Sequence, residues 1–425
     1  FNNGIGAKDN LIIAGGSLTV NAANNGIKGK DSVTVLGGSI TVTAGNDGIQ
    51  TSNGTDEGKG CIVIEGGTFT IVSAHDGIQA ETAMSISGGT FKITAGGGAS
   101  KAQTAADANA SSDSYKGIKV AADLTITGGT FTIDSLDDAV HSNGNVEIGG
   151  GTFAISTGDD GVHADGDLTV SGGKITITKS YEGLEGSNVY ISGGEISVVA
   201  SDDGINAAGG ADGSGFGGRG GDKFAAGGST SAHAIVITGG TVKVLASSDG
   251  LDSNGAVSIS GGLVIAESVA ARDGDALDAD GTVTFTGGTV ICAGTLSVGV
   301  SPAGASTQSY VYAAANVAAG SAVTVRQNGA TLITYTPYVN VGLISMSSPD
   351  IQSGESYEIY NGATLIATVT AGTGGSGGMF GGGGVPGGGG MQPGSGNRGV
   401  GREPGTAPPD FGDFGGRPAA PSAQP

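Results

Sequence analysis

Residues 160–177 read Asp-Gly-Val-His-Ala-Asp-Gly-Asp-Leu-Thr-Val-Ser-Gly-Gly-Lys-Ile-Thr-Ile. Three short runs in this stretch alternate apolar and polar residues: Val162-His163-Ala164, Leu168-Thr169-Val170 and Ile175-Thr176-Ile177. Alternation with a period of two, with Gly and Asp between the runs, is typical of β-strands joined by tight turns. The stretch therefore predicts three short strands and no helix.

The same phrase returns along the chain, and its Gly-Gly pair gives the period. The second glycine of each pair stands at positions 16, 38, 67, 89, 129, 151, 173, 194, 240, 262 and 288. The steps are 22, 29, 22, 40, 22, 22, 21, 46, 22 and 26 residues, so a period of 22 is interrupted by insertions. A fixed period of this size indicates units that bury their apolar faces only against their neighbours. Three strands per period predict an all-β protein, a parallel β-helix whose coils stack about 4.8 Å apart.

The alternation assigns one side of each predicted strand to a core. The first strand of the coils should contribute one aliphatic column: Ile27, Ile49, Ile78, Ile118, Val140, Val162, Leu184, Ile205, Leu251 and Leu277. The third strand places Phe69, Phe91, Phe131 and Phe153 at equivalent positions. We expect these rings to stack inside the core and not to form an exposed platform.

Composition narrows the range of partners. The 425 residues carry a formal net charge of −21, which argues against nucleic acid and anionic membranes and suits divalent cations. Only 37% of residues are apolar, which is sufficient because neighbouring coils cover each thin unit. The two cysteines fall on coils too distant for a disulfide, and Cys292, unlike Cys61, is expected to be a buried core thiol.

The extent of the 22-residue repeat divides the chain into three expected parts. Residues 1–303 are predicted to form the β-helix, 304–371 a small antiparallel β module, and 372–425 a flexible Gly/Pro-rich tail. Hairpin turns are predicted at Asn328-Gly329 and Asn361-Gly362, and the module should cover the open edge of the last coil. Insertions interrupt the coils near residues 53–60, 96–114 and 208–232. The first residues already read as part of a coil, so we expect a processed or truncated N-terminal boundary.

Acidic residues gather at one corner of the predicted coils, just before the first strand. On four consecutive coils they are Asp137, Asp138, Asp159, Asp160, Glu182, Asp202 and Asp203. Carboxylates about 4.8 Å apart repel one another by about 1 kcal/mol in water and by more near a protein surface, so stacking them is costly without a cation. Clustered hard oxygen ligands predict Ca²⁺. The alternative is that Asp and Asn are simply good turn residues.

Two further groups extend this corner. A second calcium candidate lies in the cluster of Asp249, Asp252, Asp273, Asp275, Asp278 and Asp280, with Asp252 aligned over Asp278. The polar side of the first strand stacks His141, His163, Glu185 and Asn206 on adjacent coils. Two histidines and a glutamate can hold a transition metal. More often such residues form a polar ladder or hydrogen-bond a sugar beside the acidic corner, and we treat these four as candidate ligand-binding residues.

Catalytic motifs are weak. No Ser-His-Asp arrangement or phosphate loop stands out, and the Gly-Gly pairs are turn repeats. A β-elimination lyase would need calcium and a basic residue beside it. Lys179 and Arg272 are the candidates, and the alternative for both is charge compensation of the carboxylates.

The corner sequences resemble a known family. The runs Asp137–His141, Gly158–Asp165, Ser180–Gly186, Ser201–Ala208 and Asp249–Gly255 are similar to a bacterial extracellular family described as carbohydrate-binding-domain proteins. The resemblance implies a right-handed parallel β-helix, bound calcium, and affinity for cellulose and acidic plant polysaccharides. That family is similar in turn to family 9 pectate lyases, in which a lysine is the base. No motif places an equivalent lysine in this chain.

Together these observations predict a secreted or cell-surface protein that binds calcium at the acidic corner and thereby holds an acidic or cell-wall polysaccharide. Calcium bridging between protein and uronate carboxylates would let an acidic protein bind an acidic glycan. The absence of Trp argues against flat stacking on crystalline cellulose. Two alternatives stay open: a calcium-dependent polysaccharide lyase, and a structural adhesin or spacer that calcium rigidifies.

Overall fold

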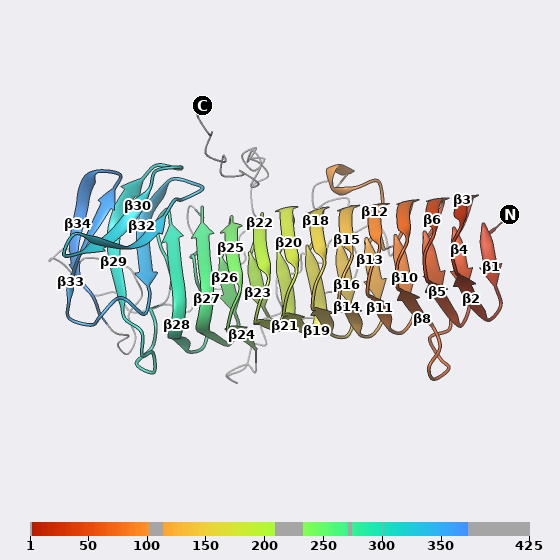
Figure 1. Ribbon diagram of the computed structural model, residues 1–425, viewed down its shortest axis with the longest axis horizontal. Helices are drawn as coiled ribbons and strands as arrows, with labels where there is room; N and C mark the ends of the chain where they lie inside the picture. The colour runs from red at the N-terminus through yellow and green to blue at the C-terminus, as the bar shows by residue number, and fades with distance from the viewer. Residues whose placement is uncertain (1, 102–113, 209–232, 271–273, 300, 373–425) are drawn as a thin grey trace, which may run out of the picture. The chain divides into compact units, whose positions relative to one another are not determined.

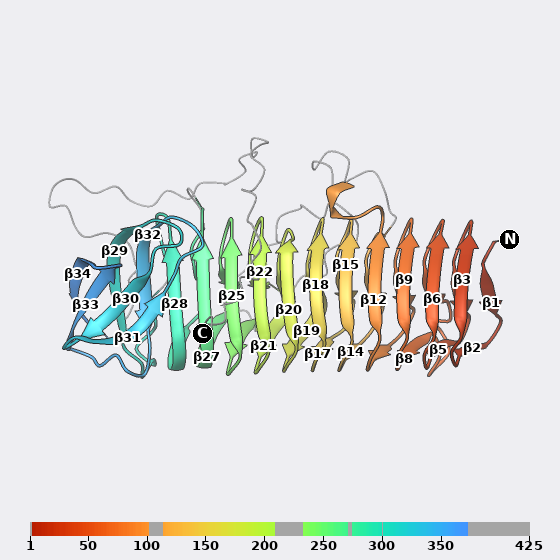
Figure 2. The same cartoon turned by 45° about the horizontal axis from the view of Figure 1, so that its top comes forward.

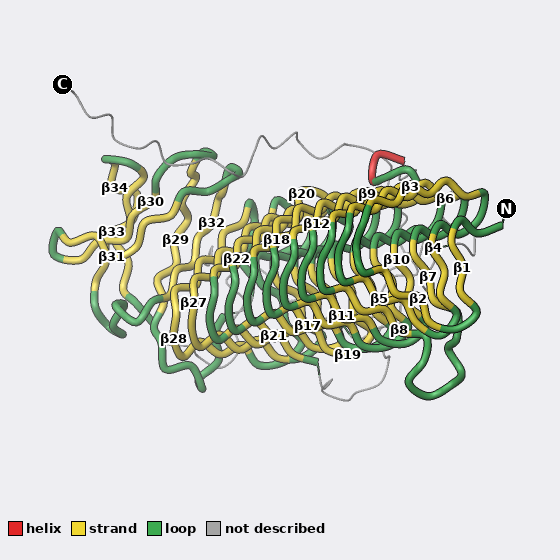
Figure 3. The backbone as a smooth tube through the Cα atoms, turned by 45° about the vertical axis from the view of Figure 1, so that its right-hand side comes forward, coloured by secondary structure: helices red, strands yellow, loops and turns green. Residues whose placement is uncertain are grey.

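The chain winds into stacked coils built from three rows of strands (Figures 1 and 3). The computed structural model describes residues 2–101, 114–208, 233–270, 274–299 and 301–372. The first row comprises β1 (Ile5–Ala7), β4 (Ile27–Gly29), β7 (Ile49–Thr51), β10 (Ile78–Ala80), β13 (Ile118–Val120), β16 (Val140–Ser142), β23 (Ile205–Ala207) and β26 (Leu251–Ser253). The second row comprises β2 (Asn10–Ile13), β5 (Ser32–Val35), β8 (Cys61–Ile64), β11 (Met84–Ile86), β14 (Leu124–Ile126), β17 (Val146–Ile148) and β24 (Ala234–Ile237).

The third row contains the longer strands, which lie side by side in Figure 2. They are β3 (Ser17–Ala22), β6 (Ser39–Ala44), β9 (Thr68–Ser73), β12 (Thr90–Ala95), β15 (Thr130–Ser135), β18 (Thr152–Thr157), β20 (Lys174–Lys179), β22 (Glu195–Ala200) and β25 (Thr241–Ala246). Four strands continue from one row into the next: β19 (Val162–Val170), β21 (Leu184–Ile191), β27 (Ala256–Ser268) and β28 (Val283–Gly294). A short 3₁₀ helix, η1 (Ala99–Lys101), follows β12.

Parallel pairing between successive coils sets the register that the repeat predicted. Val140 pairs with Val162, Val162 with Leu184, and Leu184 with Ile205. The whole predicted aliphatic column is at most 1% exposed. The predicted phenylalanine stack is also confirmed: successive ring centroids of Phe69, Phe91, Phe131 and Phe153 lie 4.5, 4.7 and 4.5 Å apart, with nearly parallel planes.

The glycine after each acidic residue has a steric reason. A Cβ atom on Gly161 would lie 2.5 Å from the carbonyl oxygen of Gly183 on the next coil and 2.4 Å from Ile177 Cδ1. The second glycine of the Gly-Gly pairs has a different reason, because Gly173 adopts a φ of 89°, which favours glycine. Both glycines therefore follow from how closely the coils approach and turn.

A second, antiparallel set of strands follows the coils. It comprises β29 (Tyr310–Val317), β30 (Val323–Gln327), β31 (Ala330–Tyr335), β32 (Val341–Ser347), β33 (Ser356–Asn361) and β34 (Thr364–Thr370). β32 pairs antiparallel with β28 and so continues the edge of the last coil. The four strands other than β29 and β32 form a separate sheet in the order β31-β30-β33-β34. The predicted turn at Asn328-Gly329 joins β30 to β31, and the one at Asn361-Gly362 joins β33 to β34. The predicted fold class, a parallel β-helix followed by a small antiparallel module, is confirmed.

Both cysteines are free thiols, as predicted. Cys292 is buried at the position that isoleucine occupies in earlier coils, and burial raises the pKa of its thiol to about 12. Most of the insertion at 208–232 and the Gly/Pro-rich tail after Gly372 lie outside the described residues. Within the described ranges, no helix is long and apolar enough to cross a membrane.

Glu267 connects β27 to the antiparallel module. Its fully buried carboxylate accepts backbone hydrogen bonds from Tyr338 at 3.0 Å and Val339 at 3.3 Å, just before β32. Burial raises the pKa of this carboxyl to about 7 from an ordinary 4.5. Glu267 therefore binds its proton more tightly in the folded state than in the unfolded state, so protonation stabilises the fold.

We expect this shift to make stability depend on pH in a defined direction. The stabilising contribution is fully present below about pH 4.5 and is lost as the pH rises through about 7, a change on the order of 3 kcal/mol. Glu267→Gln should remove this component, so the difference in unfolding free energy between wild type and variant should change between pH 5 and pH 8. Urea unfolding at the two pH values measures it, with the exposed Glu355→Gln as the control. An unchanged difference would contradict the assignment.

Candidate functional site

The acidic corner lies just before the first-row strands. The predicted ladder residues sit on successive coils, because their strands pair in register from Val140 through Leu251. Asp137, Asp138, Asp160, Glu182 and Asp203 are buried, whereas Asp159 and Asp202 are partly exposed. The paired acidic residues therefore divide into an inner group and a more exposed rim.

The inner carboxylates have a structural task that the sequence interpretation did not assign to them. Asp138 Oδ1 accepts the backbone N–H of Asp160 on the next coil at 3.0 Å, and Asp160 Oδ1 accepts that of Glu182 at 3.0 Å. Asp203 Oδ1 accepts the N–H of Asp249 at 2.7 Å. One oxygen of each carboxylate thus satisfies a turn amide of the following coil. This use supports the turn-residue explanation for the inner acids.

Lys116 supplies the cation at the N-terminal end of the ladder. Its fully buried ammonium lies 3.1 Å from Asp137 Oδ1 and 2.5 Å from Asp138 Oδ2. Although burial alone would raise it, the pKa of Asp138 is held well below its usual range by Lys116 and His141. Burial and the neighbouring Asp138 raise the pKa of Asp137. An ammonium of the chain itself therefore pairs with two of the carboxylates for which the sequence predicted a metal ion, while Asp137, Asp138 and Asp159 still offer ligand atoms within 4.8 Å of one another.

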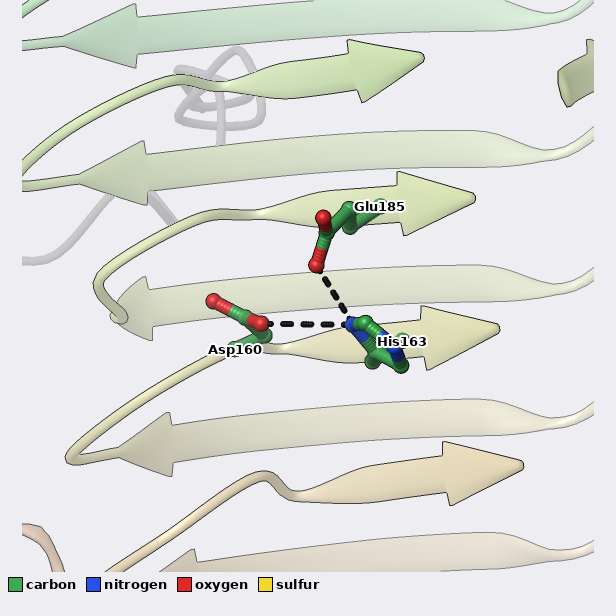
Figure 4. A group of neighbouring side chains, drawn as sticks. All are labelled: Asp160, His163 and Glu185. Atoms are coloured by element: carbon green, nitrogen blue, oxygen red, sulfur yellow. Dashed lines mark hydrogen bonds and ion pairs between the residues drawn. The ribbon is translucent and has the colours of Figure 1, made fainter. Parts of the chain in front are cut away.

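The centre of the ladder gathers Asp160, His163 and Glu185 (Figure 4). His163 Nδ1 lies 2.5 Å from Glu185 Oε2 and 3.4 Å from Asp160 Oδ2, and His163 Nε2 lies 3.0 Å from Asp165 Oδ1. The possible ligand atoms of Asp160, His163 and Glu185 all lie within 4.8 Å of one another. Burial, together with neighbouring carboxylates, raises the pKa values of Asp160 and Glu182 well above their ordinary range. Both carboxyls therefore favour the neutral, protonated form more than an exposed carboxyl does.

The predicted histidine column is present but buried. His141 and His163 stack with ring centroids 4.8 Å apart, Glu185 follows on the next coil, and Asn206 follows Glu185. All four side chains are at most 8% exposed. This burial favours a role inside the ladder over direct hydrogen bonding to a sugar.

The second predicted cluster is more open. Asp249, Asp252 and Asp275 are partly exposed and Asp278 is exposed, and Leu251 pairs with Leu277, which aligns Asp252 with Asp278 as expected. Burial, with the nearby Asp203 and Asp278, raises the pKa of Asp249 to about 7. Burial and Asp278 raise the pKa of Asp275. Asp273 and Arg272 lie outside the described residues.

Lys179 contacts a backbone carbonyl outside the ladder. Its ammonium donates a 2.6 Å hydrogen bond to the backbone carbonyl of Ala99, and partial burial lowers its pKa. The interpretation of Lys179 as charge compensation stays a prediction, and the ammonium that contacts the ladder's Asp137 and Asp138 is that of Lys116. The sequence contains a sign of the role of Lys116, because this lysine stands immediately before the first-strand glycine, where other coils carry Asp or Asn. Asp165, which contacts His163, also escaped the sequence interpretation.

Comparison with known proteins gives one match. Residues 1–161 match the model of a family described as carbohydrate-binding domain-containing protein. No curated protein and no solved structure matches the chain. The match supports carbohydrate binding, and it spans the coils from β1 through β18.

Proposed function

We propose that this protein binds an acidic or cell-wall polysaccharide through calcium held at the open cluster of Asp249, Asp252, Asp275 and Asp278. The observation that carries the proposal is the accessibility of these four carboxylates: Asp249, Asp252 and Asp275 are partly exposed and Asp278 is exposed. The pairing of Leu251 with Leu277 aligns Asp252 with Asp278 on the adjacent coil. The side chains of this cluster offer only carboxylate oxygens, and Ca²⁺ prefers hard oxygen ligands of this kind.

Exposure distinguishes this cluster from the buried ladder. A bridging calcium must keep coordination positions open toward solvent so that a uronate carboxylate can occupy them. Asp278 is exposed and Asp252 is partly exposed on the adjacent coil, so both can contribute oxygens to an ion that also contacts a ligand. Asp137 and Asp138, by contrast, are buried and already paired with Lys116.

The net charge of −21 disfavours direct contact with an acidic glycan, and a cation bridge offsets that repulsion. Without calcium, two polyanions repel each other, whereas each bound ion adds two positive charges at the contact. The partly exposed Asp159 and Asp202 extend the same acidic rim along the coils. Carbohydrate as the ligand class is supported by the family match, and secretion to the cell surface is the setting in which such a ligand is met.

A lyase activity has less support than binding. Elimination requires a base beside the ion and the uronate carbon. Lys179 is engaged with the Ala99 carbonyl, away from the open cluster's residues. Binding without cleavage is therefore the function that the arrangement favours.

The proposal predicts a selective loss in Asp252→Asn/Asp278→Asn. Retardation of the protein in gels containing polygalacturonate and calcium should weaken roughly ten-fold or more, because calcium affinity follows the number of charged ligands. Asn keeps the side-chain oxygen that accepts the Ala279 N–H, so the turn should survive. The matched control is Glu65→Gln/Glu147→Gln, which removes the same charge from two exposed residues, one directly after β8 and one within β17. Equal retardation of both variants would count against the proposed site.

A further inference from the structure

His163 is the centre of a buried ligand set of mixed chemistry. One imidazole nitrogen, His163 Nδ1, faces Glu185 Oε2 at 2.5 Å and Asp160 Oδ2 at 3.4 Å (Figure 4). These residues come from two adjacent coils, β19 with its preceding turn and β21, and each is at most 8% exposed. A nitrogen and two carboxylates converging on one point is a different donor set from the all-oxygen cluster at Asp249–Asp278.

A second observation gives this arrangement the form of a metal site. The opposite ring nitrogen, His163 Nε2, lies 3.0 Å from Asp165 Oδ1. A carboxylate that accepts the far N–H of a histidine fixes the tautomer and orients the other nitrogen as a ligand. Asp165 is itself held by a 3.1 Å hydrogen bond from Asn143 Nδ2. The ring therefore presents Nδ1, and not Nε2, to Asp160 and Glu185.

The neighbouring coil adds a further oxygen. Asn206 follows Glu185 in the same column and is fully buried. Its amide nitrogen donates to Glu182 Oε2 at 3.0 Å, but its Oδ1 has no hydrogen-bond partner among the described residues. A buried oxygen without a donor is costly, and a cation in the column would satisfy it.

We propose that Asp160, His163 and Glu185, with Asn206 Oδ1 or Glu182 as a fourth ligand, bind one first-row transition metal ion of the zinc type. An imidazole ligand suits Zn²⁺ and disfavours Ca²⁺, which takes oxygen ligands. The ligands are enclosed, so this is a closed structural centre that ties successive coils together. It is separate from the calcium-bridge proposal and does not depend on it.

Calorimetric titration of metal-free full-length protein with Zn²⁺, in the presence of millimolar Ca²⁺, tests the site. Wild type should take up one equivalent, and titration with Co²⁺ should give visible absorption bands from an ordered nitrogen-oxygen site. Asp165→Asn should weaken zinc binding roughly 10–100-fold, because the second carboxylate orients the ring. His163→Gln and Glu185→Gln should each abolish the one-equivalent binding.

The matched control is His75→Gln, which removes a histidine that stacks on Tyr115 several coils away and should retain full uptake. Far-ultraviolet circular dichroism establishes folding, and Glu185→Gln decides the question if His163→Gln does not fold. Uptake that is absent in wild type, unchanged in both ligand variants, or displaced by millimolar Ca²⁺ would overturn the proposal. A ligand variant that no longer binds zinc but still binds polysaccharide in the presence of calcium would show that the two proposed sites are independent.

Discussion

Lys116→Met is expected to destabilise the coils by about 3–5 kcal/mol, the usual cost of leaving buried charges without their partner. The ammonium contacts Asp137 and Asp138, and the three side chains are at most 1% exposed. Methionine fills similar space but carries no charge, so the two carboxylates would repel each other in a medium that solvates them poorly. The free energy of unfolding, from urea curves followed by circular dichroism, gives the magnitude.

Two companion variants isolate the electrostatic cause. Lys119→Met removes a lysine three positions away that is partly exposed and lies 3.7 Å from Asp76, so its cost should stay below about 1 kcal/mol. Adding Asp137→Asn and Asp138→Asn to Lys116→Met should recover much of the lost stability, because no uncompensated charge remains. A loss in Lys116→Met no larger than that in Lys119→Met would show that Lys116 does not neutralise the ladder.

Phe131→Ala is expected to cost about 3–5 kcal/mol, because it opens a cavity in a core that neighbouring coils cannot close. Phe131 is 1% exposed, and its ring stacks on Phe91 at 4.7 Å and on Phe153 at 4.5 Å. Two ring contacts are lost together with the buried apolar surface. Thermal and urea unfolding of the variant measure the loss.

The chain itself supplies the control for this substitution. Ile40 pairs in register with Phe69, and Ile175 with Phe153, so the coils accept isoleucine at the same position. Phe131→Ile should therefore cost less than about 1.5 kcal/mol. If the isoleucine and alanine variants lose equal stability, the stack and not the filled volume decides, and the cavity explanation fails.

The fold was predictable because one period controls both local and long-range structure. Once the Gly-Gly spacing fixes the coil, the alternation in Val162-His163-Ala164 assigns every side chain to a face, and stacking repeats that assignment. The Phe131 column and the buried Cys292 followed directly. The antiparallel module was recognisable by its Asn-Gly turns, although the pairing of β32 with β28 could not be read from local sequence.

The site was predictable in its position but not in its internal chemistry. The register placed Asp138, Asp160 and Asp203 on one corner, yet it could not show that each caps the next coil's amide. Nor could it show that Lys116 points inward to the carboxylates while Lys179 turns to Ala99, because that choice depends on side-chain rotamers. The burial of the histidines could not be predicted either. Alternation tells which side of a strand faces the core, but it does not tell what covers the other side.

The most direct test of calcium-dependent polysaccharide binding is a sedimentation or dialysis titration of the wild-type protein with polygalacturonate, first with calcium and then after excess chelator. We expect the polymer to be retained with calcium and released by the chelator, and a neutral galactan not to be retained. Retention of polygalacturonate that is equal before and after chelation, or no retention with calcium, would contradict the account.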